Sequence, residues 1–474
     1  MKRRNAAQLI TLVSFLMCAG CRMVGSDYRG PPPDALVNAP AAHGPFISAY
    51  GSEFVREPAP NAWWQLYDST LLDELVNEAL KANTDLRAAQ ANLERSAALL
   101  QQTRARRQPS VGVNFDPGYE QLSADSLLYP GSLSPTGLYD TGISVSYDLD
   151  LAGRLRRAIE AARADDDAVK AAYDLTRINV AAETTRAYAE VCNAGEQLAV
   201  ARRSLQLQLQ SVAVTQRLFD MGRARALDYT RSSGLAAQLR ANIPSLEARR
   251  SNALYRLAAL TGRPPAEYPR PVESCSEAPR LRQPLPIGDG MGLLRRRPDV
   301  REAERQLAAA TARIGVATAE LYPQVTLGLT AGSTGAFSNF FGERANRYGV
   351  GLGIHWQANQ SVTRAQIAAA GAAAKGALAH FDGVVLAALR DTESALTAYA
   401  RDQQRDEDLA TAQARASEAE NQARQLYTGG KIDFLSLLDA QRTLASADGA
   451  LAASHADLAT DQVAIFLTLG GGWE

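Results

Sequence analysis

Two long stretches of uninterrupted helical periodicity constrain the fold of this chain more than any other feature. Small and apolar residues keep spacings of three, four or seven over residues 153–219 and again over residues 361–427, and neither stretch contains proline. Each stretch predicts a helix of about 67 residues, which is roughly 100 Å long. Helices of that length cannot be buried inside one globule formed by this chain. They need neighbours along their sides, and they therefore predict an oligomeric barrel of helices.

Each long helix is predicted to turn back into a shorter helix. Met221-Gly222 ends the first and Gly429-Gly430 ends the second. In the last helix, a large aliphatic residue recurs every seven positions with a small residue three positions later, which is typical of a coiled-coil seam. The residues of this seam are Leu437, Ala440, Leu444, Ala447, Leu451, Ser454, Leu458 and Ile465. The facing seam is predicted to contain Leu409, Ala412, Ala416, Ala419, Ala423 and Leu426.

Four segments alternate between apolar and small or polar residues: about 109–116, 141–150, 323–331 and 347–357. Strands of about 9–11 residues are long enough to cross a bilayer at a tilt, with the apolar face toward lipid and the other face toward water. Four strands cannot close a barrel, so three chains are expected to supply twelve. A small soluble domain would need a hydrophobic interior, which Ser144, Gly349 and Gly351 do not supply. A free coiled-coil rod is the other alternative, but it has no use for such strands.

The second half of the chain repeats the first. Asp85, Ala89, Leu93, Pro109 and Val111 recur at the same spacing as Asp299, Ala303, Leu307, Pro323 and Val325. The first helix is predicted over residues 71–107. The expected organisation is a signal peptide (1–20), a lipid-anchored N-terminal tether (21–62), a first structural repeat (63–262), an equatorial connector (263–292), a second repeat (293–470) and a C-terminal tail (471–474). The expected fold class is an internally duplicated α+β membrane protein.

The N-terminal residues have the composition of a targeting segment. A basic start is followed by a short apolar run over residues 9–17, which is too short to span a membrane. The small residues before Cys21 suit lipoprotein signal peptidase, so Cys21 is expected to become the acylated N-terminus, and an ordinary secretory signal is the alternative. Arg22, where an Asp would cause retention at the inner membrane, favours the outer membrane. After Cys21 no stretch reaches about 18 consecutive apolar residues, so no transmembrane helix is predicted.

Composition and motifs argue against an enzyme. The net charge of −1 provides no electrostatic footprint for nucleic acid. The four histidines are scattered, no nucleophile and base lie at a catalytic spacing, and no helix follows the glycines near Gly351 as a nucleotide loop requires. No metal and no cofactor other than the lipid on Cys21 is expected. Cys192 and Cys275 remain as an even pair in an oxidising compartment, either as a disulfide or as two free buried thiols.

Several motifs, spread over the mature chain, resemble those of the TolC-like outer-membrane factors, in particular the lipoprotein branch that serves resistance-nodulation-division (RND) efflux pumps. They are Asp150-Leu151-Ala152-Gly153-Arg154, Leu293-Leu294-Arg295-Arg296-Arg297-Pro298-Asp299-Val300, Leu437-Leu438-Asp439-Ala440-Gln441-Arg442 and Leu469-Gly470-Gly471-Gly472-Trp473. The resemblance implies a trimeric cannula with a twelve-stranded β-barrel in the outer membrane, an α-barrel in the periplasm and an equatorial domain around it. Cys192 would pass this belt, where a bond to Cys275 is geometrically sensible.

The resemblance also implies a closed aperture at the periplasmic tip, formed by Leu435, Asp439 and Arg442. Three leucines would make an apolar ring, three aspartates a cation-attracting ring, and Arg442 could pair with a neighbouring aspartate. The alternatives are a heptad core position for Leu435 and a solvated helix face for Asp439. The turn at Tyr427, Gly429 and Gly430 would be docked by a periplasmic adaptor.

The function expected from these features is passive conduction of drugs or other small toxic compounds from the periplasmic assembly to the exterior. The expected partners are two further copies of the chain, an adaptor protein, an inner-membrane RND pump and outer-membrane lipid. A type I protein-secretion duct, a heavy-metal efflux duct and a structural lipoprotein are the alternatives.

Overall fold

The computed structural model describes residues 23–49, 53–125, 128, 130–277, 279, 281 and 283–471. The predicted signal peptide, Cys21 and Trp473 lie outside this range. The chain forms two compact units, which are described separately. The first contains Met1–Pro32, Leu93–Val169 and Glu302–Phe381, and the second contains Pro33–Asn92, Lys170–Arg301 and Asp382–Glu474. Each unit draws residues from both halves of the sequence.

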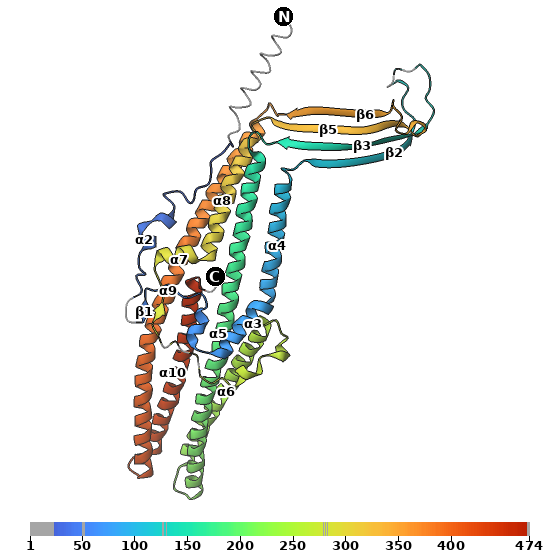
Figure 1. Ribbon diagram of the computed structural model, residues 1–474. Coiled ribbons are helices and arrows are strands. Elements are labelled where there is room, and N and C mark those ends of the chain that lie inside the picture. Colours follow the sequence, from blue (N-terminus) through green and yellow to red (C-terminus); the bar gives the residue numbers. More distant parts are fainter. Residues whose placement is uncertain are drawn as a thin grey trace. The chain divides into compact units, whose positions relative to one another are not determined.

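The long helices have the lengths that the sequence predicts (Figure 1). Helix α5 (Arg154–Asp220) has 67 residues and α9 (Ser361–Thr428) has 68. Their return helices, α6 (Ala226–Leu260) and α10 (Phe434–Thr468), have 35 residues each. Pro244 lies inside α6. An uninterrupted helical period is a local signal, and for this reason the sequence located these elements well.

The prediction of one helix over residues 71–107 is wrong, because Asn83 divides it into α3 (Thr70–Ala82) and α4 (Thr84–Ala105). The Asn83 side-chain oxygen accepts hydrogen bonds from the backbone N–H groups of Asp85 (2.8 Å) and Leu86 (3.2 Å), and it thereby caps α4. In the second half, a break before Pro298 separates α7 (Gly290–Arg296) from α8 (Pro298–Ala319).

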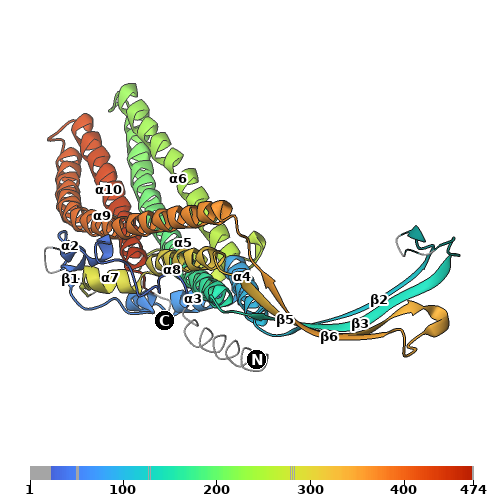
Figure 2. The same cartoon turned by 90° about the horizontal axis from the view of Figure 1, so that it is seen from above.

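Four antiparallel strands form one sheet in the order β2-β3-β5-β6, and they lie side by side in both views (Figures 1 and 2). Their bounds are Ser110–Glu120, Thr136–Leu149, Gln324–Ala336 and Asn346–His355. Three of them run further than the predicted segments. Pro117 lies within β2, which the sheet tolerates because β2 is an edge strand. Backbone pairing between the strands continues beyond the residues whose side chains alternate, so the sequence pattern predicted strands that were too short.

The main hydrophobic core belongs to the second unit and combines distant parts of the chain. The Trp63 ring is fully buried and stacks on Phe466 of α10 with ring centroids 4.8 Å apart. Val272 of the connector and Leu293 of α7 belong to the same core, together with Val191 of α5. The predicted equatorial connector therefore contributes side chains to a shared core.

The segment before Trp63 is not the extended tether that the sequence predicted. Phe54–Val55 (β1) pairs in parallel with Leu285–Pro286 (β4). The carboxylate of Glu393 in α9 accepts hydrogen bonds from the backbone N–H groups of Ile47 (2.8 Å) and Ser48 (3.0 Å). A short helix, α2 (Pro40–His43), lies beside α7 (Figure 2). The segment before Trp63 is therefore bound to residues far along the chain, and composition alone could not reveal these contacts.

Cys192 and Cys275 form a disulfide, with an Sγ–Sγ distance of 2.10 Å and a Cα–Cα distance of 4.8 Å. The bond ties the connector to the middle of α5. Gly195 lies one helical turn further along α5, and a Cβ at this position would be 2.2 Å from the Cys275 carbonyl oxygen. A glycine is therefore required where the connector crosses the helix.

The seam predicted on α9 is correct at alternate positions, where Leu409, Ala416 and Ala423 are buried or half-buried, and is displaced by one position between them. Ala412 and Ala419 are exposed, whereas Gln413 is half-buried and Glu420 is only 3% exposed. The Gln413 amide donates to Asp448 of α10 (2.8 Å), which identifies this face as the one that meets the last helix. Hydrophobic periodicity could not distinguish the face used within the chain from the alanine-rich face left exposed.

Within the described residues, α9 also contains a stretch that is long and apolar enough to cross a membrane by length and composition. The sequence predicts no such helix when an unbroken apolar run is required. Alanine is frequent in α9, and it suits close packing between helices as well as it suits lipid.

Candidate functional site: a two-faced sheet and the ends of two helical hairpins

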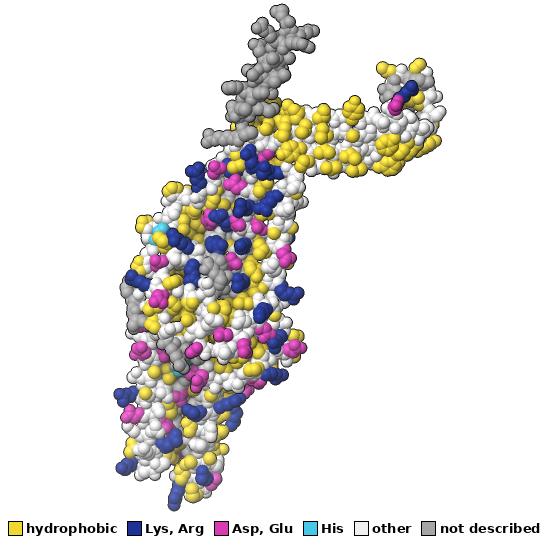
Figure 3. Space-filling model, in the orientation of Figure 1, with side chains coloured by type: hydrophobic (Ala, Val, Ile, Leu, Met, Phe, Trp, Pro, Cys, Tyr) yellow, Lys and Arg dark blue, Asp and Glu magenta, His cyan; other side chains and the backbone are white. Residues whose placement is uncertain are grey.

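One face of the sheet is apolar across all four strands. The register aligns Val111 with Val145, Val145 with Leu329, and Leu329 with Val350, so one row of aliphatic side chains crosses the sheet. Leu327 and Leu352 continue this face in a second row. Most of these side chains are exposed, with Val113 76% and Val350 73% accessible, while Val145 and Leu327 are half-buried. Figure 3 shows apolar side chains gathered over these strands.

The opposite face carries small and polar residues. Gly112, Ser144, Thr330 and Gly349 form the neighbouring row. Further along this face, the Asp140 carboxylate accepts hydrogen bonds from the Asn114 amide (2.9 Å) and the Thr334 hydroxyl (2.9 Å), and it pairs with Arg347 (2.5 Å). A sheet with one aliphatic face and one polar face has the pattern of strands that separate lipid from water.

Strands β2 and β6 stand at the two edges of this sheet, and every residue of both strands is exposed. Each edge presents a row of backbone hydrogen-bonding groups that suits pairing with another strand. Ser146, Gly328 and Gly351 are aligned in a further row of the polar face.

The two helical hairpins of the second unit end in matched turns. Gly222 and Gly430 adopt left-handed backbone conformations with φ of +71° and +69°. In the first turn the Arg223 N–H donates to the Leu218 carbonyl oxygen (2.7 Å), and in the second the Lys431 N–H donates to that of Leu426 (2.9 Å). Both are glycine-dependent helix C-caps. The turn between α9 and α10 thus has a structural twin in the turn between α5 and α6.

Tyr427 is less available for docking than the sequence suggested. Its ring packs edge-on against Phe434 with centroids 5.7 Å apart, beside a cluster formed by Phe434, Leu438 and Leu235 of α6. Burial, followed by the nearby Asp228 carboxylate, raises the pKa of the Tyr427 hydroxyl. The exposed part of the turn is Gly429-Gly430. Phe434 was missed, although an aromatic residue directly after a helix-capping Asp is a usable signal.

The three predicted aperture residues share one exposed face of α10. Leu435 is 50% exposed, and Asp439 and Arg442 are also exposed, whereas Leu437 and Leu438 point into the chain. Leu435 is therefore not a core position of its own chain. Asp433 caps this end of α10 by accepting from the Ser436 N–H (3.0 Å), and the hydrogen bonds from the Ser436 hydroxyl and backbone lower the pKa of Asp433.

Polar contacts also join α10, which forms a hairpin with α9, to α5 of the other hairpin. The Gln441 amide, within the motif that contains Asp439, donates to the Ser211 hydroxyl (2.8 Å). Further along, the His455 ring nitrogen Nδ1 lies 2.7 Å from Glu196 Oε1. Gln441 was not singled out from the sequence, because its partner is far away along the chain. These bonds hold the hairpin that carries the aperture residues against α5.

Between α9 and α10 two carboxyl groups face each other. Burial, then a hydrogen bond with Asp402, then the charges of Asp402 and Asp457, raise the pKa of Asp461 to about 7. Arg405 lies 3.0 Å from Asp457 but 3.7 Å from Asp402. Its positive charge therefore only partly neutralises the facing carboxyl groups of Asp402 and Asp461. Among the described residues, no group of three or more His, Cys, Asp or Glu side chains is arranged to hold a metal ion.

The Asp461 carboxyl is expected to make thermal stability depend on pH. Its pKa is raised in the folded chain, so the folded state binds this proton more tightly than the unfolded state, and stability is lost as pH rises from about 4 to about 7. Asp461→Asn keeps a hydrogen-bond donor toward Asp402 and removes the charge. We expect its apparent melting temperature to exceed that of the wild type at pH 8, on the order of 2 °C, and to match it at pH 5.

Asp408→Asn, at an exposed position of α9, is the matched control and should not reproduce this pH-dependent gain. Equal melting temperatures of the wild type and Asp461→Asn at both pH values would contradict a protonated Asp461.

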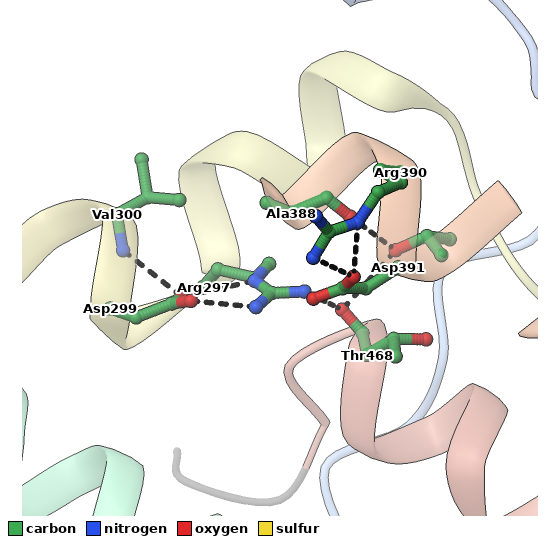
Figure 4. A network of polar contacts seen from close by, with 8 residues as sticks. Arg297, Asp299, Val300, Ala388, Arg390, Asp391 and Thr468 are labelled. Atoms are coloured by element: carbon green, nitrogen blue, oxygen red, sulfur yellow. Dashed lines mark hydrogen bonds and ion pairs between the residues drawn. The ribbon is translucent and has the colours of Figure 1, made fainter. Parts of the chain in front are cut away.

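Two of the sequence motifs meet at the end of α10 (Figure 4). The Arg297 guanidinium donates to the Thr468 carbonyl oxygen (2.8 Å) and pairs with Asp299 (2.6 Å). It therefore occupies the carbonyl end of α10, where a cation is favoured. Gly470 has φ of +68°, and a Cβ on it would lie 3.1 Å from Arg297 Cγ. The Arg-Pro-Asp motif and the terminal glycine motif thus pack against each other at the end of α10.

A two-faced sheet with free edges, joined in sequence to helices of about 100 Å, defines a component of a membrane-spanning channel. The family model described as outer membrane efflux protein matches residues 75–263 and 292–471. The chain belongs to this family, whose members are channel-type proteins and not enzymes.

Individual relatives cover nearly the whole chain. Nodulation protein T of Rhizobium leguminosarum bv. viciae is 28% identical, over 99% of this chain and 94% of that protein. Outer membrane protein OprJ of Pseudomonas aeruginosa is 29% identical, over 87% of this chain and 86% of that protein. The solved structure of the outer-membrane channel OprN has a TM-score of 0.87 and 34% identity, over 95% of this chain and 99% of that one.

Proposed function

We propose that the chain is the outer-membrane exit duct of a tripartite RND-type efflux pump, which passively conducts drugs or other small toxic compounds from the periplasmic assembly to the exterior. The observation that carries the proposal is the aliphatic row through Val111, Val145, Leu329 and Val350, which is exposed at all but Val145, on a sheet whose other face is polar. Family membership and relatives such as OprJ, named as an outer membrane protein, support it.

Three copies are proposed to form the duct. Four strands cannot close a barrel, whereas three chains supply twelve, and β2 of one copy can pair with β6 of the next. Internal duplication is supported by equal element lengths, since α4 and α8 have 22 residues each and α6 and α10 have 35 each. The exposed alanine-rich face of α9 is proposed to meet neighbouring helices in the α-barrel.

The proposed attachment and partners follow from the ends of the chain and of the hairpins. Cys21 is proposed to carry the lipid that anchors the protein at the outer membrane, and no other cofactor is expected. The turn at Tyr427, Gly429 and Gly430 is proposed to receive a periplasmic adaptor that connects the duct to an inner-membrane pump. The exposure of Gly429-Gly430 supports this assignment, while the packed Tyr427 ring supports the shape of the turn.

The gate is proposed to be formed by three copies of Leu435, Asp439 and Arg442. Their exposure on one face of α10 leaves them available to the same residues of other copies. Three carboxylates around one axis attract cations, and Arg442 can hold a neighbouring Asp439 with charge-assisted hydrogen bonds.

Single-channel recording in planar bilayers tests the duct and its gate together. The wild type is expected to show small, cation-selective conductance, and Asp439→Ala combined with Arg442→Ala is expected to raise the conductance severalfold because the inter-chain links are lost. Asp448→Ala, which lies on the α9-facing side of the same helix, serves as the control. No conductance in any form would contradict the duct, whereas equal, large conductance in all forms would remove these residues as the gate.

A further inference from the structure

The first described residues of the chain are held by one buried arginine. Arg157, in the first turn of α5, is 1% exposed. Its Nε donates to the Val24 carbonyl oxygen (2.9 Å), and its Nη2 donates to the carbonyl oxygen of Gly25 (2.9 Å) and to the Asp27 carboxylate (2.8 Å). Glu160 binds Nη1 (2.6 Å) and orients the group. The planar fork of arginine suits several acceptors at once, which a lysine could not satisfy equally.

Glycines allow the segment to approach the body this closely. Gly25 has φ of +84°, and a Cβ on it would lie 2.7 Å from the Gly315 Cα. Gly153 has φ of +81°, and its Cβ would lie 2.6 Å from Met23 Cγ. A Cβ on Gly315 would meet the Arg157 side chain at 2.8 Å. The Val24 N–H also donates to the Ala152 carbonyl oxygen (3.2 Å), so the backbone is bound on both sides.

Tyr28 fixes the other end of the segment. Its hydroxyl donates to Glu304 of α8 (2.7 Å), and its ring packs against a cluster of Ala164, Ala308 and Ala309. Burial and the Glu304 carboxylate raise the pKa of this hydroxyl, which therefore stays a neutral donor. Residues 23–28 thus occupy a built site at the point where β3 is followed by α5.

We propose that Arg157 is a positioning residue for the lipid anchor, and that it fixes the acyl chains on Cys21 beside the loop that joins β3 to α5. The inference rests on the proposed acylation of Cys21. Arg22 alone separates Cys21 from Met23, so the lipid cannot be far from whatever holds Met23. Leu149 is the last residue of β3, and Asp150 to Gly153 form the loop at which strand gives way to helix. The proposal therefore requires the lipid and the end of β3 to enter the same membrane leaflet.

Hydrogen–deuterium exchange of the full-length protein tests the clamp itself. In a Cys21→Ser background, Arg157→Ala is expected to speed exchange of the Val24 amide, whose N–H donates to the Ala152 carbonyl oxygen, at least tenfold, since residues 24–27 lose the donor that holds them. Arg156→Ala is the matched control, because Arg156 contacts Asp150 instead and should leave this exchange unchanged. Gly25→Ala disturbs the same segment mainly through a clash with the Gly315 backbone and should match Arg157→Ala. Unchanged protection in both variants would overturn the clamp.

The role in lipid positioning is tested by the yield of heat-resistant oligomer recovered from outer membranes. Arg157→Ala is expected to lower it severalfold when Cys21 is present and to add little in the Cys21→Ser background. Equal losses in both backgrounds would overturn positioning and leave Arg157 as a general stabilising residue. Mass spectrometry that finds no acyl group on wild-type Cys21 would overturn the inference and the proposed anchoring together. The duct function is tested independently by the single-channel recording described above.

Discussion

Replacing Val145 by arginine is expected to abolish most membrane insertion of the protein. Val145 lies in the middle of the aliphatic row, paired with Val111 on one side and Leu329 on the other. If this face meets lipid, an arginine near the bilayer centre costs about 2–4 kcal/mol in each copy. At about 1.4 kcal/mol per factor of ten, the heat-resistant oligomer recovered from outer membranes should fall more than about tenfold.

Ser146→Arg is the matched control for this experiment, because Ser146 is the next residue of β3 and belongs to the polar face. Its arginine would point toward water, and the yield should stay within about twofold of the wild type. Similar losses for both variants would contradict a lipid-facing row. Normal yield of Val145→Arg would contradict it as well, and would favour a water-exposed sheet.

Loss of the Cys192–Cys275 disulfide is expected to lower stability by about 2–4 kcal/mol. The bond closes a loop with a sequence separation of 83, so it removes substantial freedom from the unfolded chain. It also fixes the connector to α5 within the main core, where Cys192 is fully buried. Cys192→Ala combined with Cys275→Ala should therefore unfold at lower denaturant concentration, as followed by circular dichroism in detergent.

The double alanine variant supplies its own control. A reducing agent should lower the stability of the wild type toward that of the variant and should leave the variant unchanged. A reductant effect of equal size in both proteins would mean that the disulfide is not its target. Cys21→Ser, which keeps the disulfide, should respond to the reductant as the wild type does.

The elements that the sequence located best are those whose signal is local. The two long helices lack proline and keep a helical period throughout, so their lengths could be predicted to within a few residues. The strands could be located because side chains alternate between faces, and a register error would place every aliphatic residue on the wrong face. The glycines that end the long helices were also visible, since the helix cap requires a left-handed conformation at Gly222 and Gly430.

The errors concern features that depend on distant partners. Asn83 breaks a helix because its side chain caps α4 while its amide donates to the Leu260 carbonyl oxygen (3.2 Å). The segment around Ile47 has the composition of a linker, yet Glu393 binds its backbone. The seam of α9 passes through Gln413 and Glu420, and not through the alanines beside them, since polar partners on α10 and within α9 satisfy these side chains.

The candidate sites divide in the same way. The period, length and faces of the helices and strands could be predicted from the order of apolar residues, because these properties follow from local backbone geometry. The tertiary structure alone decided which motifs meet, as Arg297 does with Thr468 and Gly470, and Arg157 with Val24 and Gly25. Buried polar groups need partners, and the topology of the chain determines which distant residues are near enough to provide them.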